Sequence, residues 1–198
     1  MRFFIAICLI CPLLGHSANN DKKTEFTVSG IYGAVICKGH EINLKKSLPL
    51  PCEITTGKNS FLELTGNSNE RLILGATSTV IINENLLSMK KGSIRIEGAR
   101  ELKISAYSHE VSRKAGKQLF FSSEVFSDLE MLSFDGEMVF NEKVEEEGKD
   151  KKVIKITIPK NSWVSIGGRF GNELGDFFEL SKEQLAYFSS FLLPQSSE

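Results

Sequence analysis

Two cysteines and a nearby histidine are the residues whose spacing could support redox or metal chemistry. Cys37 and Cys52 form an even pair, and His40 follows the first of them by three residues. In an oxidising compartment such a pair is typical of a disulfide, which stabilises a fold by about 3 kcal/mol for a loop of this size. Two cysteines and one histidine fall short of a zinc ligand set. We expect a Cys37–Cys52 disulfide, with free thiols and a metal site as the alternatives.

His109 is the other histidine that could take part in catalysis, because Ser108 precedes it and Glu110 follows it. Adjacent residues of a strand point to opposite faces, so the serine and the glutamate would flank the imidazole instead of acting on it in series. No Gly-x-Ser-x-Gly elbow occurs in the chain. We therefore expect His109 to be a surface or loop residue, and we predict no catalytic residue.

Paired acids and one glycine-rich segment complete the set of candidate chemical groups. Asp128 and Glu130 are one such pair, but a glycosidase needs one carboxyl group in an apolar pocket and a second at a set distance. Nothing in the sequence marks that arrangement. Residues 167–171 read Gly-Gly-Arg-Phe-Gly without an apolar helix pattern after them, which favours a turn or bulge over a phosphate cradle. The sequence thus predicts a protein that is not an enzyme and that has no cofactor or metal.

The sole tryptophan and one phenylalanine are the candidate binding residues. Trp163 could be a ligand platform or a core residue, and Phe188 lies on the apolar face of a predicted helix at 181–193. Ser181 is a candidate N-cap with Gln184 three residues on, which is the capping-box pattern. The apolar positions of the helix follow helical spacing at Leu185, Phe188 and Leu192. We expect this amphipathic helix to dock on the rest of the protein and to end at Pro194.

The elements that position these residues are short β-strands. Alternating apolar runs that recur every roughly 8–12 residues predict an all-β sandwich, barrel or roll, with a solenoid-like roll as a variant. Asp135-Gly136 is a tight-turn dipeptide that predicts a hairpin between 131–134 and 137–140, and 141–152 is a charged loop. We expect a β domain over 24–143 and a β extension over 153–180. The earlier runs lie at 26–29, 31–36, 61–64, 71–74, 79–82, 86–89, 93–97, 102–106 and 110–113.

The N-terminus has the pattern of a secretory signal peptide. Arg2 precedes an apolar run over 3–14, and small residues lead to Ala18. The run is well short of the roughly 20 residues that span a bilayer as a helix, so we expect no stable membrane insertion after cleavage. Cleavage after Ala18 or Ser17 would leave a periplasmic or secreted bacterial protein. The formal net charge of −1 for 198 residues argues against nucleic acid as a partner.

Several short motifs follow one another in a set order over residues 26–143. They are Phe26–Ile36, Ile54–Leu64, Leu72–Ile81, Leu86–Ile96, Gly116–Phe120 and Asp135–Val139. The second of them reads Ile-Thr-Thr-Gly-Lys-Asn-Ser-Phe-Leu-Glu-Leu. In their order these motifs resemble the FecR domain family, although Lys117 stands where the family usually has threonine.

The resemblance implies an all-β periplasmic domain without catalytic residues. Family members that regulate sigma factors place this domain after a cytosolic segment and a membrane helix, and they receive a signal from an outer-membrane receptor. A signal peptide in place of those segments implies a stand-alone module. We therefore expect a protein-binding or scaffold module of the envelope, whose partner is an unidentified envelope protein. A carbohydrate-binding or carbohydrate-active protein with a glycan partner is the alternative, and docking on a membrane through the helix is a third.

Overall fold

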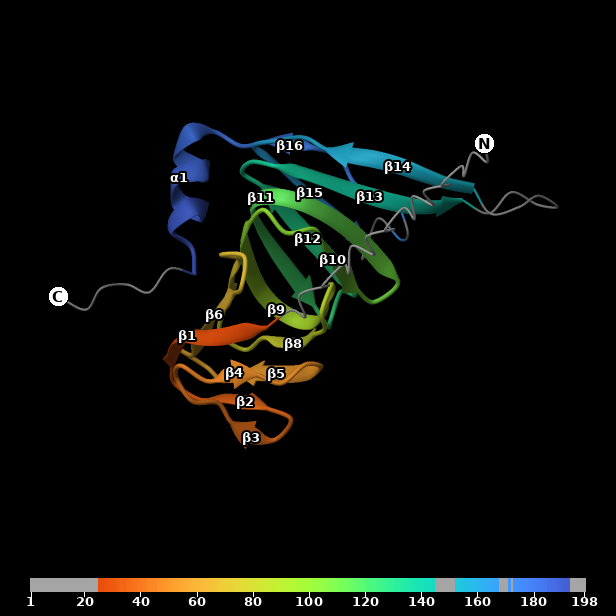
Figure 1. Ribbon diagram of the computed structural model, residues 1–198. Coiled ribbons are helices and arrows are strands. Elements are labelled where there is room, and N and C mark those ends of the chain that lie inside the picture. The colour runs from red at the N-terminus through yellow and green to blue at the C-terminus, as the bar shows by residue number, and fades with distance from the viewer. Residues whose placement is uncertain (1–24, 145–151, 168–170, 172, 193–198) are drawn as a thin grey trace, which may run out of the picture.

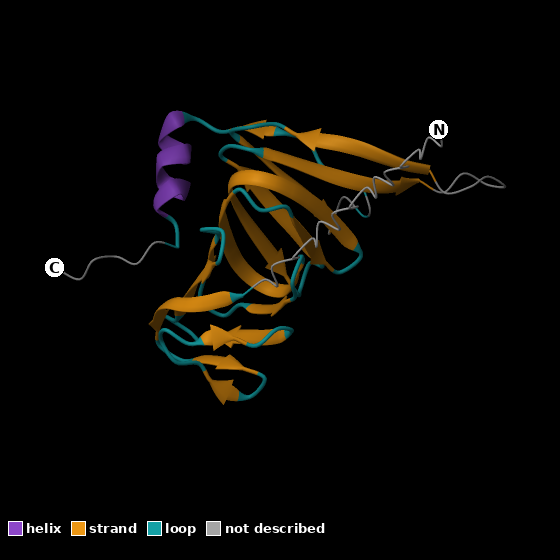
Figure 2. Cartoon of the chain, viewed as in Figure 1, coloured by secondary structure: helices purple, strands orange, loops and turns teal. Residues whose placement is uncertain are grey.

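A computed structural model of the chain describes residues 25–144, 152–167, 171 and 173–192. These residues form strands almost throughout, with a single helix that follows the last strand (Figures 1 and 2). The strands are β1 Phe26–Tyr32, β2 Val35–Cys37, β3 His40–Glu41, β4 Ser47–Leu48, β5 Cys52–Thr56, β6 Phe61–Gly66, β7 Arg71–Leu74, β8 Thr79–Ile82, β9 Leu86–Gly98, β10 Leu102–Ala106, β11 His109–Ser123, β12 Asp128–Ser133, β13 Glu137–Val144, β14 Lys152–Ile158, β15 Ser162–Gly167 and β16 Phe178–Glu179; the helix is α1 Lys182–Ser190.

The strands pair in two groups that β9 and β11 join into one continuous sheet. The first group, called the first sheet below, has the order β16-β15-β12-β11-β9-β7-β6-β1-β4. The second sheet has the order β3-β2-β5-β8-β9-β10-β11-β13-β14. Neighbouring strands are antiparallel except β9 and β10, which run parallel. The described chain is therefore all-β, as the sequence predicts, and its strands form one open sheet that folds over on itself.

β9 and β11 each pass from one sheet to the other through a glycine. In β9 this happens at Gly92, whose backbone has a φ of +96° and where an added Cβ would lie 2.2 Å from the Ser78 hydroxyl. In β11 it happens at the bulge between Arg113 and Ala115, followed by Gly116 with a φ of +98°. The runs expected at 86–89 and 93–97 therefore belong to one long strand, which the glycine bends instead of ending.

The hydrophobic core lies between the two sheets. Most strands contribute one face to it, and alternation along β5, β6 and β10 places every second residue inside. Its fully buried members come from both sheets and include Phe26, Ile54, Leu62, Leu64, Leu72, Leu74, Val80, Ile82, Leu87, Ile94, Ile96, Ile104, Val111, Phe120, Leu129, Met131, Met138, Val164 and Ile166.

Asp135-Gly136 does not form the predicted hairpin. β12 pairs with β11 and β15 in the first sheet, whereas β13 pairs with β11 and β14 in the second. The dipeptide instead carries the chain from one sheet to the other, and Asp135 Oδ1 accepts a hydrogen bond from the Lys117 amide. A tight-turn dipeptide specifies local backbone shape, but the strand pairing was decided by long-range contacts with β11.

Part of the charged loop predicted at 141–152 lies in strands. β13 continues to Val144 and β14 begins at Lys152, so the two strands form a hairpin around residues 145–151, which lie outside the described residues. The predicted signal peptide with its cleavage position Ala18 also lies outside them. Within the described part of the chain, no helix is both long and apolar enough to cross a membrane.

Candidate functional site

A stripe of side chains on the outer face of the first sheet positions the candidate binding residues. In register, Phe178 of β16 lies opposite Trp163, Trp163 opposite Leu132, Leu132 opposite Leu119, and Leu119 opposite Arg95. Residues directly opposite each other in antiparallel strands share one face of the sheet. The stripe thus crosses five strands on the side that faces away from the main core.

Helix α1 packs on this stripe and closes a second, smaller apolar cluster. Ser181 accepts from the Gln184 amide while the Gln184 side chain accepts from the Ser181 amide, which confirms the predicted capping box. The helix ends at Ser190, before the predicted end at 193. Trp163 and Phe188 both belong to the cluster, so the structure brings the two predicted binding residues together. The other members are Leu119, Phe121, Leu132, Phe134, Leu180, Leu185, Phe191 and Leu192.

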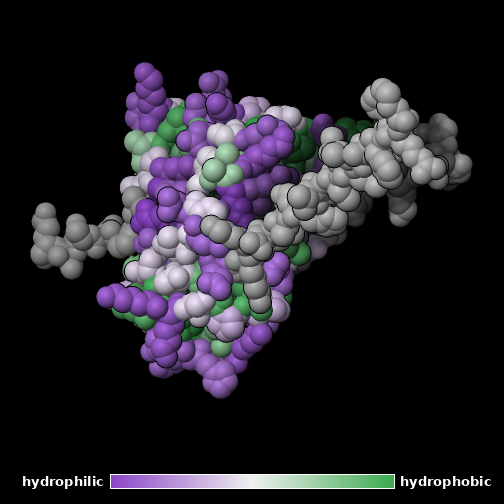
Figure 3. All heavy atoms as spheres, viewed as in Figure 1, coloured by the Kyte–Doolittle hydropathy of each residue, from purple (hydrophilic) through white to green (hydrophobic). Residues whose placement is uncertain are grey.

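Aromatic rings continue from this cluster to the solvent. Phe178 is 51% exposed and its ring centre lies 5.8 Å from that of Trp163, while Tyr187 is 64% exposed and meets Phe188 edge-on. We call Trp163, Phe178, Tyr187 and Phe188 the C-terminal aromatic surface. Elsewhere, on the face drawn in Figure 3, coloured hydrophobic residues form small groups interrupted by hydrophilic ones.

Two cations of the first sheet hold the end of α1. Arg95 is 3% exposed, and its guanidinium donates to the backbone oxygens of Ser189 and Phe191, the latter at 3.1 Å. Glu97 accepts from Arg95 Nε at 2.7 Å. Lys117 Nζ donates to the Ser189 hydroxyl at 3.2 Å and lies 4.9 Å from the centre of the Phe134 ring. Cations at a helix C-terminus satisfy its free carbonyl groups and favour its dipole, so these contacts fasten the helix over the stripe.

Asp128 and Glu130 lie beside the aromatic stripe. They alternate with the core residue Leu129 along β12, so both face outward, and Glu130 pairs with Ser165, two residues from Trp163. Partial burial, followed by the charge of Asp128, raises the pKa of Glu130. Two acids on one face of one strand point in the same direction and do not oppose each other across a cleft, as a glycosidase pair does.

His109 is buried, which contradicts the prediction of a surface or loop residue. It begins β11, is 7% exposed, and lies close to Gly167, where an added Cβ would be 3.1 Å from Nε2. Burial lowers the pKa of His109 because the charged imidazolium loses its hydration. The prediction failed because His109 is buried beside residues far along the chain, such as Gly167, which its local sequence does not show.

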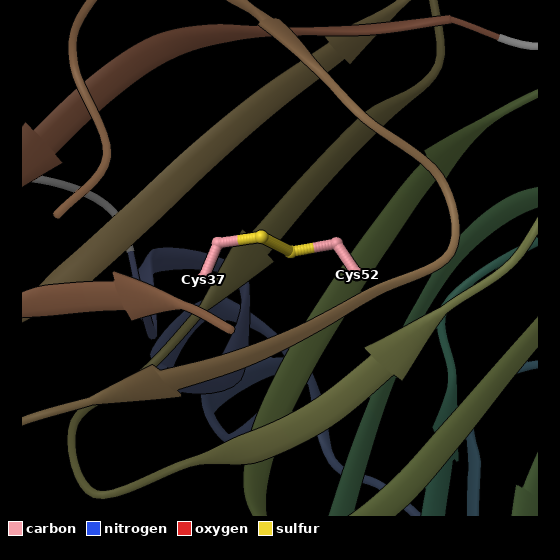
Figure 4. Close-up of a disulfide and its surroundings, with 2 residues drawn as sticks. All are labelled: Cys37 and Cys52. Carbon is pink, nitrogen blue, oxygen red and sulfur yellow. A yellow bond between two sulfur atoms is a disulfide. The ribbon is translucent and has the colours of Figure 1, made fainter. Parts of the chain in front are cut away.

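The structure contains the predicted disulfide between Cys37 of β2 and Cys52 of β5, with their Cα atoms 6.0 Å apart (Figure 4). Beside it lies a pocket of about 280 Å³, whose lining includes Cys37, His40 and Lys46. Within the described ranges, no three histidine, cysteine or acidic residues gather as a metal site would require. The disulfide ties β2, near the edge of the second sheet, to the buried end of β5.

Polar residues of the motifs at 54–64 and 72–81 stabilise the turns between strands. Thr56 Oγ1 donates to the Gly75 carbonyl at 2.6 Å and accepts from the Ser78 amide at 2.9 Å. The Ser60 hydroxyl accepts from the Ala34 amide at 3.0 Å, and the Ser78 hydroxyl accepts from the amide of residue 93 at 3.0 Å. These side chains are buried and form hydrogen bonds with backbone groups, so their role here is to position strands.

Sequence reasoning missed part of the aromatic surface. Phe178 precedes the N-cap in a segment without alternation, and Tyr187 lies off the apolar face of the helix. The adjacent pair Phe177-Phe178 in a charged and polar segment was the available signal for Phe178. Arg95 gave no signal, because its role depends on a contact with residues far along the chain.

Comparison with known proteins gives a likeness in structure. No protein-family model matches the chain, and no curated protein matches it in sequence. A crystal structure from Parabacteroides distasonis, described as a candidate anti-sigma factor, is similar with a TM-score of 0.54 and 11% sequence identity. The match covers 70% of this chain and 64% of that chain, so this chain spans less than two thirds of its neighbour's length. At this identity the likeness shows the fold alone.

Proposed function

We propose that the protein is a non-catalytic binding module of the bacterial envelope, related to FecR domains and linked to signalling at the cell surface. The C-terminal aromatic surface is the observation that carries the proposal. Trp163 and Phe188 pack in one cluster between the sheet and the helix, and Phe178 and Tyr187 extend the same apolar surface into solvent. Exposed aromatic residues on a fixed scaffold are the usual anchors of protein–protein contacts.

The family relation rests on two independent likenesses. The ordered motifs of residues 26–143 resemble FecR domains, and the fold resembles that of a chain described as a candidate anti-sigma factor. The polar motif residues Thr56, Ser60 and Ser78 serve strand positioning, as expected for motifs that a family shares for its fold. The disulfide and the N-terminal signal pattern support a location in the periplasm or outside the cell.

Affinity capture from an envelope fraction tests the proposed function. The full chain, oxidised and immobilised, should retain a specific envelope protein at micromolar concentration. Phe178→Ala should weaken retention at least about tenfold, as for an aromatic hot spot. Val125→Ala is the matched control, since Val125 is 85% exposed and lies outside the aromatic surface. Absence of any retained protein at micromolar concentration would contradict the proposal.

A carbohydrate ligand is the second candidate, and the position of Glu130 favours it. This half-buried acid lies on the same sheet face as Trp163, within two residues of it across the β12–β15 pair. The hydroxyl group of a sugar ring stacked on Trp163 could donate a hydrogen bond to that carboxylate. Screening against envelope glycans distinguishes the candidates: glycan binding that Glu130→Gln abolishes and Phe178→Ala spares would favour this one.

A further inference from the structure

We propose that β14 is a docking edge that accepts an extended acidic strand from a partner protein. This inference deepens the proposed function, because it names a mode of binding for the same module. The two sheets have four edges among the described strands, and three of them end in very short strands: β16, β4 and β3 have two residues each. The fourth edge is β14, which has seven residues.

Short edge strands prevent unwanted pairing, whereas a long edge strand presents a row of unpaired backbone groups. β14 pairs with β13 alone, and in the described part of the chain no backbone hydrogen bond reaches it from elsewhere. β11 pairs with β13 only as far as Phe140, so residues 141–144 and 152–155 form a two-stranded arm. Figure 1 shows the far ends of β13 and β14 extending past the other strands.

The apolar face of β14 emerges from the core as the arm leaves the body. Ile158 is 1% exposed, Ile156 is half-buried against the core, and Ile154 is 38% exposed. These three residues alternate along the strand and therefore share one face. A strand added beside β14 would place its own alternate residues next to Ile154 and Ile156 and would continue the core over them. Apolar residues at every second position of the partner fit this face.

The opposite face of β14 selects the charge of the partner. Lys155 and Thr157 lie on it, both exposed, and Lys155 makes no ion pair with any residue that the structure describes. A carboxylate directly across from Lys155 would be a favourable cross-strand pair, and a lysine there would be unfavourable. The partner strand therefore alternates apolar and acidic residues, and main-chain hydrogen bonds supply its affinity.

A second copy of β14 fits this edge less well. In the antiparallel register that sets Ile154 beside Ile156, Lys155 lies directly opposite Lys155 of the other copy. Like charges in that position destabilise the pair. The charge of β14 thus favours a partner with carboxylates over self-association.

Hydrogen exchange of the full, oxidised chain tests this edge, with short synthetic peptides as probes. One peptide alternates valine with glutamate, and its control alternates valine with lysine. The glutamate peptide should slow exchange of the β14 amides and should bind about fivefold more tightly than the lysine peptide. Lys155→Glu should reverse this preference. Lys58→Glu makes the same charge change in the β5–β6 turn, several strands from β14, and should leave the preference unchanged.

Three results would overturn the inference: no slowing of β14 exchange by either peptide at millimolar concentration, equal binding of both, or slowing that depends only on the concentration of the chain itself. The last would identify a second copy as the occupant. These outcomes can be told apart from failure of the proposed function. If Lys155→Glu still captures the envelope protein, the chain is a binding module whose interface does not involve β14.

Discussion

Removing the Arg95 guanidinium should release helix α1 without unfolding the sheets. None of the helix residues is fully buried, so the helix depends strongly on this contact. Arg95→Ala deletes two hydrogen bonds from a charged donor to the backbone oxygens of Ser189 and Phe191. Each is worth about 1.5 kcal/mol at the low end for a charged group, which gives roughly 3 kcal/mol for the docked helix. Glu97 keeps Arg71 as a partner at 3.7 Å, which limits any further cost.

Hydrogen exchange over residues 181–192 measures this loss directly. A loss of roughly 3 kcal/mol predicts exchange about 100-fold faster in α1, with β9 and β11 little changed. Arg71→Ala is the matched control, because Arg71 lies in the same sheet but is about one-third exposed, and surface pairs contribute roughly 0–1 kcal/mol. If α1 exchanges less than about threefold faster in Arg95→Ala, or equally faster in both variants, the proposed fastening of the helix is wrong.

Three further predictions concern stability. Replacing both Cys37 and Cys52 by serine should lower the free energy of unfolding by about 3 kcal/mol in urea titrations, and a reductant should then have no further effect. Leu132→Ala, at a 2% exposed position beneath α1, should cost about 2–5 kcal/mol in the same assay, and a cost below about 1 kcal/mol would mean that the second cluster is loosely packed. Because burial lowers the pKa of His109, the folded state favours the neutral imidazole. The contribution of His109 to the free energy of unfolding should therefore be fully present above about pH 6.5 and should be lost as the pH falls through that value toward the lowered pKa. His109→Gln should remove this part of the pH dependence.

Features with a local physical cause could be predicted from the sequence. The capping box of Ser181 and Gln184 lies within one helical turn, and alternation marks strands such as Phe61–Gly66 and Leu102–Ala106. The disulfide followed from the parity of the cysteines. Each of these signals depends on neighbours within a few residues or on composition, so no knowledge of the tertiary structure was needed.

Features that depend on pairing between distant strands could not be predicted. The Asp135-Gly136 dipeptide suggested a tight hairpin turn, yet it links two sheets, and the runs at 86–89 and 93–97 form one strand that bends at Gly92. A glycine with positive φ serves a turn and a bend equally well, and only the partner strands decide between them. His109 is likewise buried beside a residue far along the chain, Gly167.

Some residues of the candidate site could be predicted from the sequence and others could not. Trp163 and Phe188 could be selected by residue type and helical spacing, and the structure places them in one cluster. Phe178 joins them through the β15–β16 register, and Arg95 through a contact with the distant helix end. The open edge at β14 could not be predicted either, because the sequence does not show which strands lie at the edges of the two sheets.

Site-specific photo-crosslinking in a bacterial envelope is the most direct test that this protein is a binding module. A photoreactive phenylalanine analogue would be placed at Phe178 on the aromatic surface, at Ile154 on the β14 edge, and at Lys58 as an exposed control. A discrete adduct with an envelope protein should form from position 178 and from position 154, and not from position 58. Absence of adducts from both 178 and 154, or the same adducts from all three positions, would contradict the proposed function.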